Sequence, residues 1–271
     1  HDSDLEDVIA YDYIDEQARQ KITKHVSSLY ESLKEETKKA TDPQELAAKS
    51  AEEFKSRAQD KRFRRILDRA NVQETFLGDV EKIMESILSD REMSLCVGTI
   101  KTVHSYLYEH SFEVAIHAAI LAKHFGFPRG EIRDVVLGSL LHDIGQIFLP
   151  EDLLNKKGPL SERDEEMFRQ HTVLGYHLLK DRNDISLLSA HIAYQHHEHQ
   201  DGSGYPRGIT GQNRLVPKQE ALRGSGGIHR FAEVVAVPDF YDELVSERPY
   251  RRALGPDEAA NLLVMVRCAA R

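Results

Sequence analysis

His142-Asp143, a histidine followed directly by an aspartate, stands inside an apolar run of the chain. The flanking apolar residues are Val136, Leu137, Leu140 and Leu141. They predict a core-facing helix over residues 131–147, where solvated polar side chains are not expected. Imidazole and carboxylate are strong metal ligands, but a single His-Asp pair also occurs as a buried, hydrogen-bonded pair. The pair therefore indicates metal chemistry only in combination with further ligands.

Three histidines precede this pair on one predicted helix. His110, His117 and His124 recur every seven residues on one face of a helix that runs to about residue 125. Seven residues correspond to about 10.5 Å of rise, so the three imidazoles cannot share one ion. We expect one of them, His110, to be a ligand and the other two to be pocket or surface side chains.

The remaining candidate ligands are distributed over the chain that follows, as His171, His196, His197 and Asp239. Together with His110, His142 and Asp143 they offer five imidazoles and two carboxylates, which are too many for one ion and suit two. A donor set of nitrogen and oxygen without thiolate favours iron or manganese, with nickel or zinc as alternatives, over calcium or magnesium. In such pairs a bridging water is acidified to hydroxide, and both ions stabilise in-line displacement at phosphorus. The residue types thus predict a two-metal hydrolase, provided that the seven side chains converge.

Helices are the only regular elements that the sequence predicts for positioning these residues, so the expected fold class is all-α. Gly126 and Pro128 end the helix that carries His110, and Ser161 supplies an N-cap for the helix that carries His171. Further helices are predicted over 185–197 and 231–244, followed by a last one opened by Pro256. The glycine-rich segment 201–208 predicts a loop, and residues 209–230 predict either a lid or an ordinary surface loop.

Residues 1–100 predict helices without catalytic residues. One apolar stripe consists of Ile22, Val26, Leu29 and Leu33, and another consists of Phe76, Val80, Ile83 and Ile87. Asp42-Pro43 predicts a helix start. We expect an N-terminal helical region over 1–100 and a second domain over 101–271. The apolar stripes either belong to a regulatory or dimerising module, such as the interface of a homodimer, or pack against the second domain.

The composition restricts the class of protein. The 271 residues are 40% hydrophobic and 30% charged, with a net charge of −9, which argues against a nucleic-acid polymer as partner. An anionic small substrate then needs metal ions or local arginines. Cys96 and Cys268 match neither a disulfide framework nor a thiolate zinc site, so a cytoplasmic setting is expected. No apolar run approaches the roughly 20 residues of a membrane span. Because the chain begins with His1, we expect a fragment or a processed protein.

The linked motifs resemble those of the HD-GYP domain, a subgroup of the HD phosphohydrolases. The resemblance is carried by His142-Asp143-Ile144-Gly145, His171, His196-His197 and Asp201-Gly202-Ser203-Gly204-Tyr205-Pro206, and it covers residues 106–260 or so. It implies a helical bundle that hydrolyses cyclic di-GMP to the linear dinucleotide pGpG or on to GMP. It also implies that the seven residues above are the metal ligands.

The resemblance further implies individual roles in the site. Asp143 matches the bridging carboxylate, and Arg248 and Arg251 match positions that contact substrate phosphates, a role that suits guanidinium groups. The loop Gly204-Tyr205-Pro206 resembles one that lines the substrate pocket and, in some members, meets partner proteins.

Two positions depart from the family pattern. Gln146 replaces the usual lysine, so this side chain can donate a hydrogen bond to a phosphate oxygen but loses the charge-assisted part of that contact. Tyr106 replaces a glutamate that accompanies a third metal in some members, which favours two metals. The expected function is therefore a phosphodiesterase. The alternatives are a cyclic dinucleotide receptor with weak or no hydrolysis and an enzyme that prefers mixed cyclic GMP-AMP.

Overall fold

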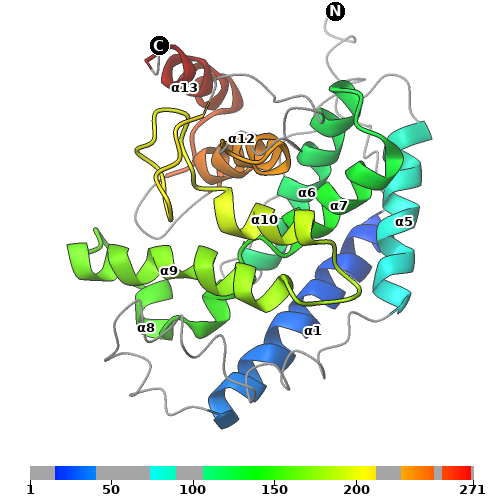
Figure 1. The fold of residues 1–271 in the computed structure, drawn as a ribbon, viewed down its shortest axis with the longest axis horizontal. Helices are drawn as coiled ribbons and strands as arrows, with labels where there is room; N and C mark the ends of the chain where they lie inside the picture. Colours follow the sequence, from blue (N-terminus) through cyan, green and yellow to red (C-terminus); the bar gives the residue numbers. More distant parts are fainter. Residues whose placement is uncertain (1–15, 41–73, 90–105, 212–226, 247–251, 270–271) are drawn as a thin grey trace, which may run out of the picture.

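The computed structural model describes residues 16–40, 74–89, 106–211, 227–246 and 252–269. Its regular elements within these ranges are helices that are joined by turns and loops (Figure 1). One isolated β-bridge pairs Asp201 with Thr210. The predicted all-α fold class is confirmed. In the same ranges, no helix combines the length and the hydropathy that crossing a membrane requires.

Five helices form the bundle that carries the candidate site. They are α6 (Tyr106–His124), α7 (Arg129–Leu140), α9 (Glu162–Leu179), α10 (Leu187–Gln195) and α12 (Arg230–Val245). Helix α10 packs against α7, α9 and α12, while α6 packs against α7 and α12, so these elements enclose one core (Figure 1). Two shorter or terminal helices, α8 (Glu151–Leu154) and α13 (Pro256–Ala269), flank this bundle.

Small residues line the inner face of α6. Ala115, Ala118, Ala119 and Ala122 are at most 1% exposed. Because the distance between packed helices depends on the side chains at the contact, these alanines allow α7 and α12 to lie close to α6. On α7, Gly138 has the same effect, since a Cβ there would lie 2.3 Å from a side-chain carbon of Ile192 on α10.

The helix predicted over 131–147 is interrupted, and this part of the prediction is wrong. Helix α7 ends at Leu140, a turn carries His142 and Asp143, and a short 3-10 helix, η1 (Ile144–Phe148), follows. The imidazole Nδ1 of His142 lies 2.6 Å from the carbonyl oxygen of Ser139, so the side chain occupies an acceptor that a continuing helix would use. The His-Asp pair therefore lies on a turn and not on a helical face.

Gly145 permits the close contact between η1 and α9. A Cβ at this position would lie 1.9 Å from the carbonyl oxygen of His171 and 2.6 Å from the backbone nitrogen of Gly175. Only glycine leaves room for backbone to approach backbone this closely. The turn is thus held directly against the helix that carries His171.

Side chains cap the start of three other helices, and Ser161 is the one of these caps that the sequence predicted. Ser161 caps α9 in a capping box with Asp164, whose backbone nitrogen lies 3.3 Å from the serine Oγ. Ser186 caps α10, and its Oγ lies 3.1 Å from the backbone nitrogen of Ser189. His229 caps α12 through Nδ1, which accepts from the backbone nitrogen of Phe231.

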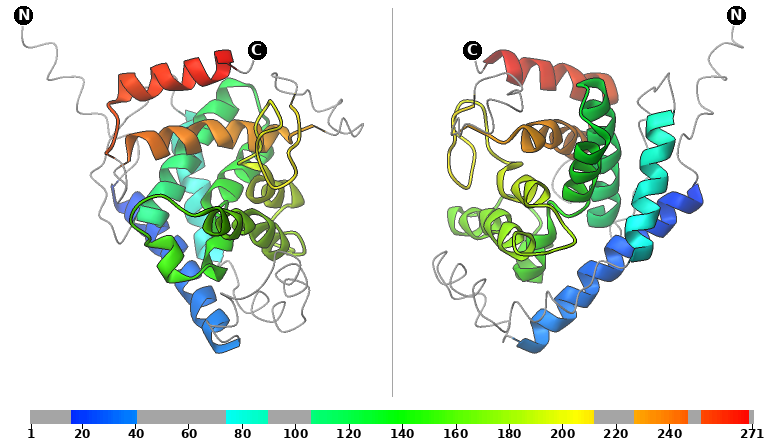
Figure 2. Two further views of the ribbon diagram at one scale, coloured as in Figure 1. Left: turned by 90° about the vertical axis from the view of Figure 1, so that its left-hand side faces the viewer. Right: turned by 45° about the vertical axis from the view of Figure 1, so that its right-hand side comes forward.

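The two N-terminal helices, α1 (Glu16–Ala40) and α5 (Glu74–Ser89), lie side by side along one flank of the bundle (Figure 2). The predicted stripe of α1 is buried: Ile22, Val26 and Leu33 are at most 3% exposed. Helix α1 packs against α5, α6 and η1, so in this structure the stripe meets its own chain. The predicted helix start at residues 42–43 lies outside the described residues, and the boundary between 1–100 and 101–271 stays a prediction.

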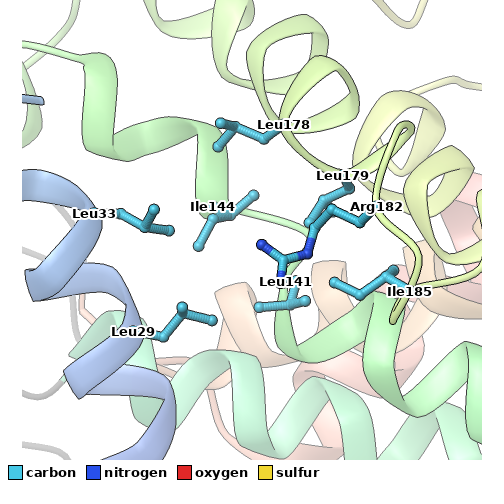
Figure 3. Close-up of a pocket in the computed structure, with 8 residues that line it drawn as sticks. All are labelled: Leu29, Leu33, Leu141, Ile144, Leu178, Leu179, Arg182 and Ile185. Carbon is cyan, nitrogen blue, oxygen red and sulfur yellow. The ribbon is translucent and has the colours of Figure 1, made fainter. Parts of the chain in front are cut away.

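A small apolar pocket lies where α1 meets the turn after α7. Leu29 and Leu33 of α1 face Leu141 and Ile144, the two neighbours of His142-Asp143 in sequence (Figure 3). The opposite wall includes Arg182, whose guanidinium pairs with Asp184 at 2.6 Å. The N-terminal helix is therefore packed directly behind the turn that carries two candidate ligands.

Candidate metal centre

All seven predicted ligands converge at one place in the bundle. Helix α6 contributes His110, the turn after α7 contributes His142 and Asp143, α9 contributes His171, the end of α10 contributes His196 and His197, and α12 contributes Asp239. Three groups of them bring one ligand atom per residue within 4.8 Å of the others, namely His171, His196 and His197; His110, His142 and Asp143; and His142, His196 and Asp239. The groups share members, so they form one continuous cluster.

Asp143 lies between two parts of this cluster. Its Oδ2 is 3.5 Å from Nε2 of His142, whereas its Oδ1 is 3.3 Å from Nε2 of His171 and 3.8 Å from Nε2 of His196. The two oxygens therefore face different imidazoles. A carboxylate in this position can place one oxygen on each of two neighbouring cations.

Backbone carbonyls orient three of the imidazoles. The Nδ1 atoms of His142, His171 and His196 lie 2.6, 2.7 and 3.1 Å from the carbonyl oxygens of Ser139, Phe168 and Ile192. A hydrogen bond from Nδ1–H to a carbonyl selects the tautomer whose Nε2 carries a free lone pair. In all three residues Nε2 is the atom directed into the cluster, as metal ligation requires.

A carboxylate outside the predicted set orients His110. Its Nδ1 lies 2.7 Å from Oδ2 of Asp242, and its Nε2 lies 3.1 Å from Oδ1 of Asp239. A metal-binding histidine whose second nitrogen donates to a carboxylate is a recurrent arrangement, and it raises the basicity of the ligand. The sequence prediction missed Asp242, although a second aspartate three residues after Asp239 places both on one face of a helix.

The electrostatics keep both carboxylates of the cluster ionised. Burial raises the pKa of Asp143, but the imidazoles of His142, His171 and His196 outweigh it and lower the pKa to about 2. Burial acts the same way on Asp239, and His110 and His142 hold its pKa well below the ordinary value. Ionised carboxylates are the form that binds cations.

The imidazoles divide into two kinds. Burial lowers the pKa of His171, that of His196 still further, and that of His197 to about 3, so these three are neutral at ordinary pH. Burial also lowers the pKa of His110, but the hydrogen bonds to Asp239 and Asp242 outweigh it and raise the pKa to about 10. Positive charge is therefore favoured between the carboxylates, where a bound cation can take the place of the proton.

The donor set fits divalent cations. Nε2 of His142 is buried without a hydrogen-bond partner, and carboxylate oxygens of Asp143 and Asp239 lie 3.5 and 3.6 Å from it. A buried polar atom without a partner is costly unless something else satisfies it. A cation held by imidazole and carboxylate would do so. These residues can hold metal ions of the class predicted from their types.

The loop after the adjacent histidines is fastened against the cluster. Glu198 accepts hydrogen bonds from the backbone nitrogens of Arg207 at 2.8 Å and Ile209 at 2.7 Å, one on each carboxylate oxygen. Gly204 lies so close to the preceding turn that a Cβ would be 2.2 Å from the backbone nitrogen of His199. This tight packing places Tyr205 beside the metal-ligand candidates.

Tyr205 stacks on His197, with ring centroids 4.7 Å apart and an interplanar angle of 28°. Its ring also meets His171 edge-on at 6.3 Å. The Gly204-Tyr205-Pro206 loop thus lines the rim of the cluster, where the sequence prediction put a substrate-binding loop. The tyrosine ring shields the imidazole of His197 on one side.

The other predicted residues are placed as follows. Gln146 lies in η1, three residues after Asp143, with its side chain partly buried. Arg248 and Arg251 lie outside the described residues, as does the side chain of Tyr106. His117 is buried and faces the ring of Tyr241, and His124 is exposed at the end of α6. Of the three regularly spaced histidines, His110 is the one that the structure brings to the cluster.

Comparison with known proteins identifies the class. The family model described as HD domain matches residues 82–268, and the chain belongs to this family. A cyclic di-GMP phosphodiesterase of Pseudomonas aeruginosa is 32% identical over 66% of this chain and 40% of its own length. A cyclic di-GMP phosphodiesterase of Thermotoga maritima is 33% identical over 69% of this chain and 44% of its own length.

A third relative carries a different name. The 3'3'-cGAMP-specific phosphodiesterase 1 of Vibrio cholerae is 28% identical over 68% of this chain and 38% of its own length. The chain spans less than half the length of each of these three curated relatives. The predicted resemblance to HD phosphohydrolases is confirmed, and the chain is similar to phosphodiesterases for cyclic dinucleotides.

Proposed function

We propose that the chain is a metal-dependent phosphodiesterase that hydrolyses cyclic di-GMP to linear pGpG, to GMP, or to both. The observation that carries the proposal is the convergence of five imidazoles and two carboxylates from four helices and a turn on one buried cluster. The names of the relatives in Pseudomonas aeruginosa and Thermotoga maritima support the substrate class.

The proposed cofactor is a pair of divalent cations, with iron or manganese favoured and nickel or zinc as alternatives, because the donors are imidazole nitrogens and carboxylate oxygens. The cations, when bound, supply Lewis acidity that activates water and stabilises charge on the phosphate during displacement. Asp143 is proposed to bridge them, since its two oxygens face different imidazoles. The remaining six side chains would complete the set of residues that holds the cations.

The chain itself holds and orients the substrate. Gln146 follows Asp143 by three residues and is proposed to donate an amide hydrogen bond to a phosphate oxygen. Tyr205, which stacks on His197, is proposed to form the rim of the site together with Gly204 and Pro206. Arg248 and Arg251 are proposed to contact substrate phosphates, as their position in the family motif implies.

Two observations support other substrates or roles. The neutral amide at Gln146 favours a receptor with weak or no hydrolysis, because a charge-assisted contact to phosphate is lost. The similarity to the Vibrio cholerae enzyme supports mixed cyclic GMP-AMP as an alternative substrate. A protein partner at the Gly204-Tyr205-Pro206 loop, a homodimer through the N-terminal helices and a cytoplasmic setting remain proposals from the sequence.

The test is hydrolysis by protein loaded anaerobically with iron or manganese. Wild type is incubated with cyclic di-GMP and with mixed cyclic GMP-AMP, and the products are separated by chromatography. His142→Ala and Asp143→Ala are expected to lose both bound metal and turnover. His124→Ala is the matched control, because this histidine is exposed on the helix that also carries His110. Full turnover in either cluster variant would refute the proposal.

Restoring the charge at position 146 separates the enzyme from the receptor. A competent enzyme with Gln146→Lys is expected to change its rate only modestly, by less than about tenfold. A receptor that lacks only this charge is expected to gain hydrolysis that wild type does not show. Binding of cyclic di-GMP by wild type without product formation would favour the receptor.

A further inference from the structure

Arg169 lies on α9, two residues before His171, at the rim of the cluster. Its guanidinium carbon is 5.2 Å from the centroid of the Tyr205 ring, in a cation–π contact. The arginine side chain is 52% exposed, so its donors reach solvent. Through Tyr205, which stacks on His197, this cation is connected to the metal-ligand candidates by direct ring contacts.

The contact with Tyr205 positions the guanidinium group, whose central carbon lies over the aromatic ring. Its N–H donors lie at the edge of the planar group. A planar edge of N–H donors suits two oxygens of a phosphate. Tyr205 is itself held by the loop that Glu198 fastens, so the platform beneath Arg169 is anchored.

The present partner of Arg169 is one that a ligand can displace. Nη2 lies 3.3 Å from Oε2 of Glu165, which is four residues earlier on the same helix. Both side chains are 52% exposed, and an exposed pair of this kind contributes little to stability. An arriving phosphate therefore competes with a weakly held carboxylate.

A cyclic dinucleotide offers such a cation a binding partner. A cyclic dinucleotide carries two phosphodiester groups, and the metal centre accounts for only the one that is cleaved. The net charge of −9 provides no general attraction for an anion, and Gln146 brings no charge of its own. A local cation at the rim can hold the second phosphate, in addition to the contacts proposed for Arg248 and Arg251.

We propose that Arg169 binds the phosphate of the cyclic dinucleotide that is not cleaved, with Tyr205 as the platform that orients its guanidinium. The inference rests on the proposed function and adds a substrate-binding residue to it. Arg169 acts in ground-state binding, so its loss raises KM and leaves kcat largely unchanged. A substrate with a single phosphate does not need it.

The experiment compares Arg169→Gln and Arg169→Lys with wild type on two substrates. With cyclic di-GMP, Arg169→Gln is expected to raise KM about tenfold, as the loss of one charge-assisted contact predicts. Arg169→Lys keeps the charge without the planar fork, so its KM is expected to lie between those of wild type and Arg169→Gln. With bis(4-nitrophenyl) phosphate, which has one phosphate, kcat/KM is expected to stay within about twofold. Arg163→Gln, exposed on the same helix, is the control.

Glu165→Gln provides a test of opposite sign. Removing the competing carboxylate is expected to lower KM for cyclic di-GMP, by about twofold to threefold. A rise in KM like that of Arg169→Gln would show that the ion pair itself is required and would overturn the proposal. An unchanged KM in Arg169→Gln, or equal losses on both substrates, would overturn it as well. If wild type does not hydrolyse cyclic di-GMP, the proposed function fails first, and this assignment fails with it.

Discussion

Asp242→Asn removes one buried negative charge beside the candidate metal centre and preserves the size of the side chain. In wild type, Oδ2 of Asp242 lies 2.7 Å from Nδ1 of His110, and both side chains are at most 4% exposed. Ser246 donates to the same oxygen at 3.2 Å. The carboxylate therefore makes a buried, charge-assisted hydrogen bond to a ligand candidate, and the asparagine can make only a neutral one.

The expected magnitude follows from this contact. A hydrogen bond to a charged group contributes about 1.5–3 kcal/mol, and a neutral one about half as much. A bound cation would draw electron density from the imidazole, so the hydrogen bond from its Nδ1–H group to a carboxylate would become stronger. Loss of such an orienting carboxylate typically lowers metal affinity about 10- to 100-fold, which corresponds to about 1.4–2.7 kcal/mol.

The assay is anaerobic titration of metal-free protein with Mn²⁺ in competition with a chromophoric chelator. Asp152→Asn is the matched control, because Asp152 is exposed on α8. The unfolding midpoint in urea shows whether the variants remain folded. A folded Asp242→Asn variant that binds Mn²⁺ within about twofold of wild type would refute the role assigned to this carboxylate.

Three further changes test the packing around the site. Gly145→Ala places a Cβ 1.9 Å from a backbone oxygen of α9, and we expect the free energy of unfolding to fall by about 3 kcal/mol. In Gly130→Ala the new Cβ enters open space, so the free energy of unfolding measured in urea should not fall. Equal losses in the two alanine variants would contradict the close packing at Gly145. Burial lowers the pKa of His229 to about 4, so between about pH 6.5 and 4 the unfolded state binds more protons and stability falls as the pH falls. His229→Asn keeps a capping oxygen, so the free energy of unfolding in urea should depend less on pH in this range. An unchanged pH dependence would contradict the role given to His229. Each carboxylate oxygen of Glu198 accepts from one backbone N–H of the loop, and Glu198→Gln replaces one of these oxygens with a donor. The free energy of unfolding should fall by about 1–3 kcal/mol. Amide exchange in that loop should accelerate relative to the exposed control Glu166→Gln, and equal protection would contradict the clamp.

The sequence predicted most of the elements and all seven candidate ligands of the site. Capping residues such as Ser161 and the apolar stripe of α1 act within a few residues of chain, so their patterns can be interpreted without knowing the fold. The chemistry of imidazole and carboxylate is likewise a property of residue type. These features determined the all-α class and the set of seven candidate ligands, and the linked motifs determined the family.

The tertiary structure decided what depends on contacts between distant segments. The turn at His142-Asp143 is held against α9 because Gly145 leaves room for the backbone of that helix, a contact between residues far apart in sequence that no local period records. Asp242 became recognisable as the partner of His110 only when α12 was packed against α6. The contact of Arg169 with Tyr205 has the same origin, since it joins a helix to a loop that is positioned by hydrogen bonds to Glu198. Residue types state which bonds a side chain can make, and the packing of helices determines which of those bonds are made.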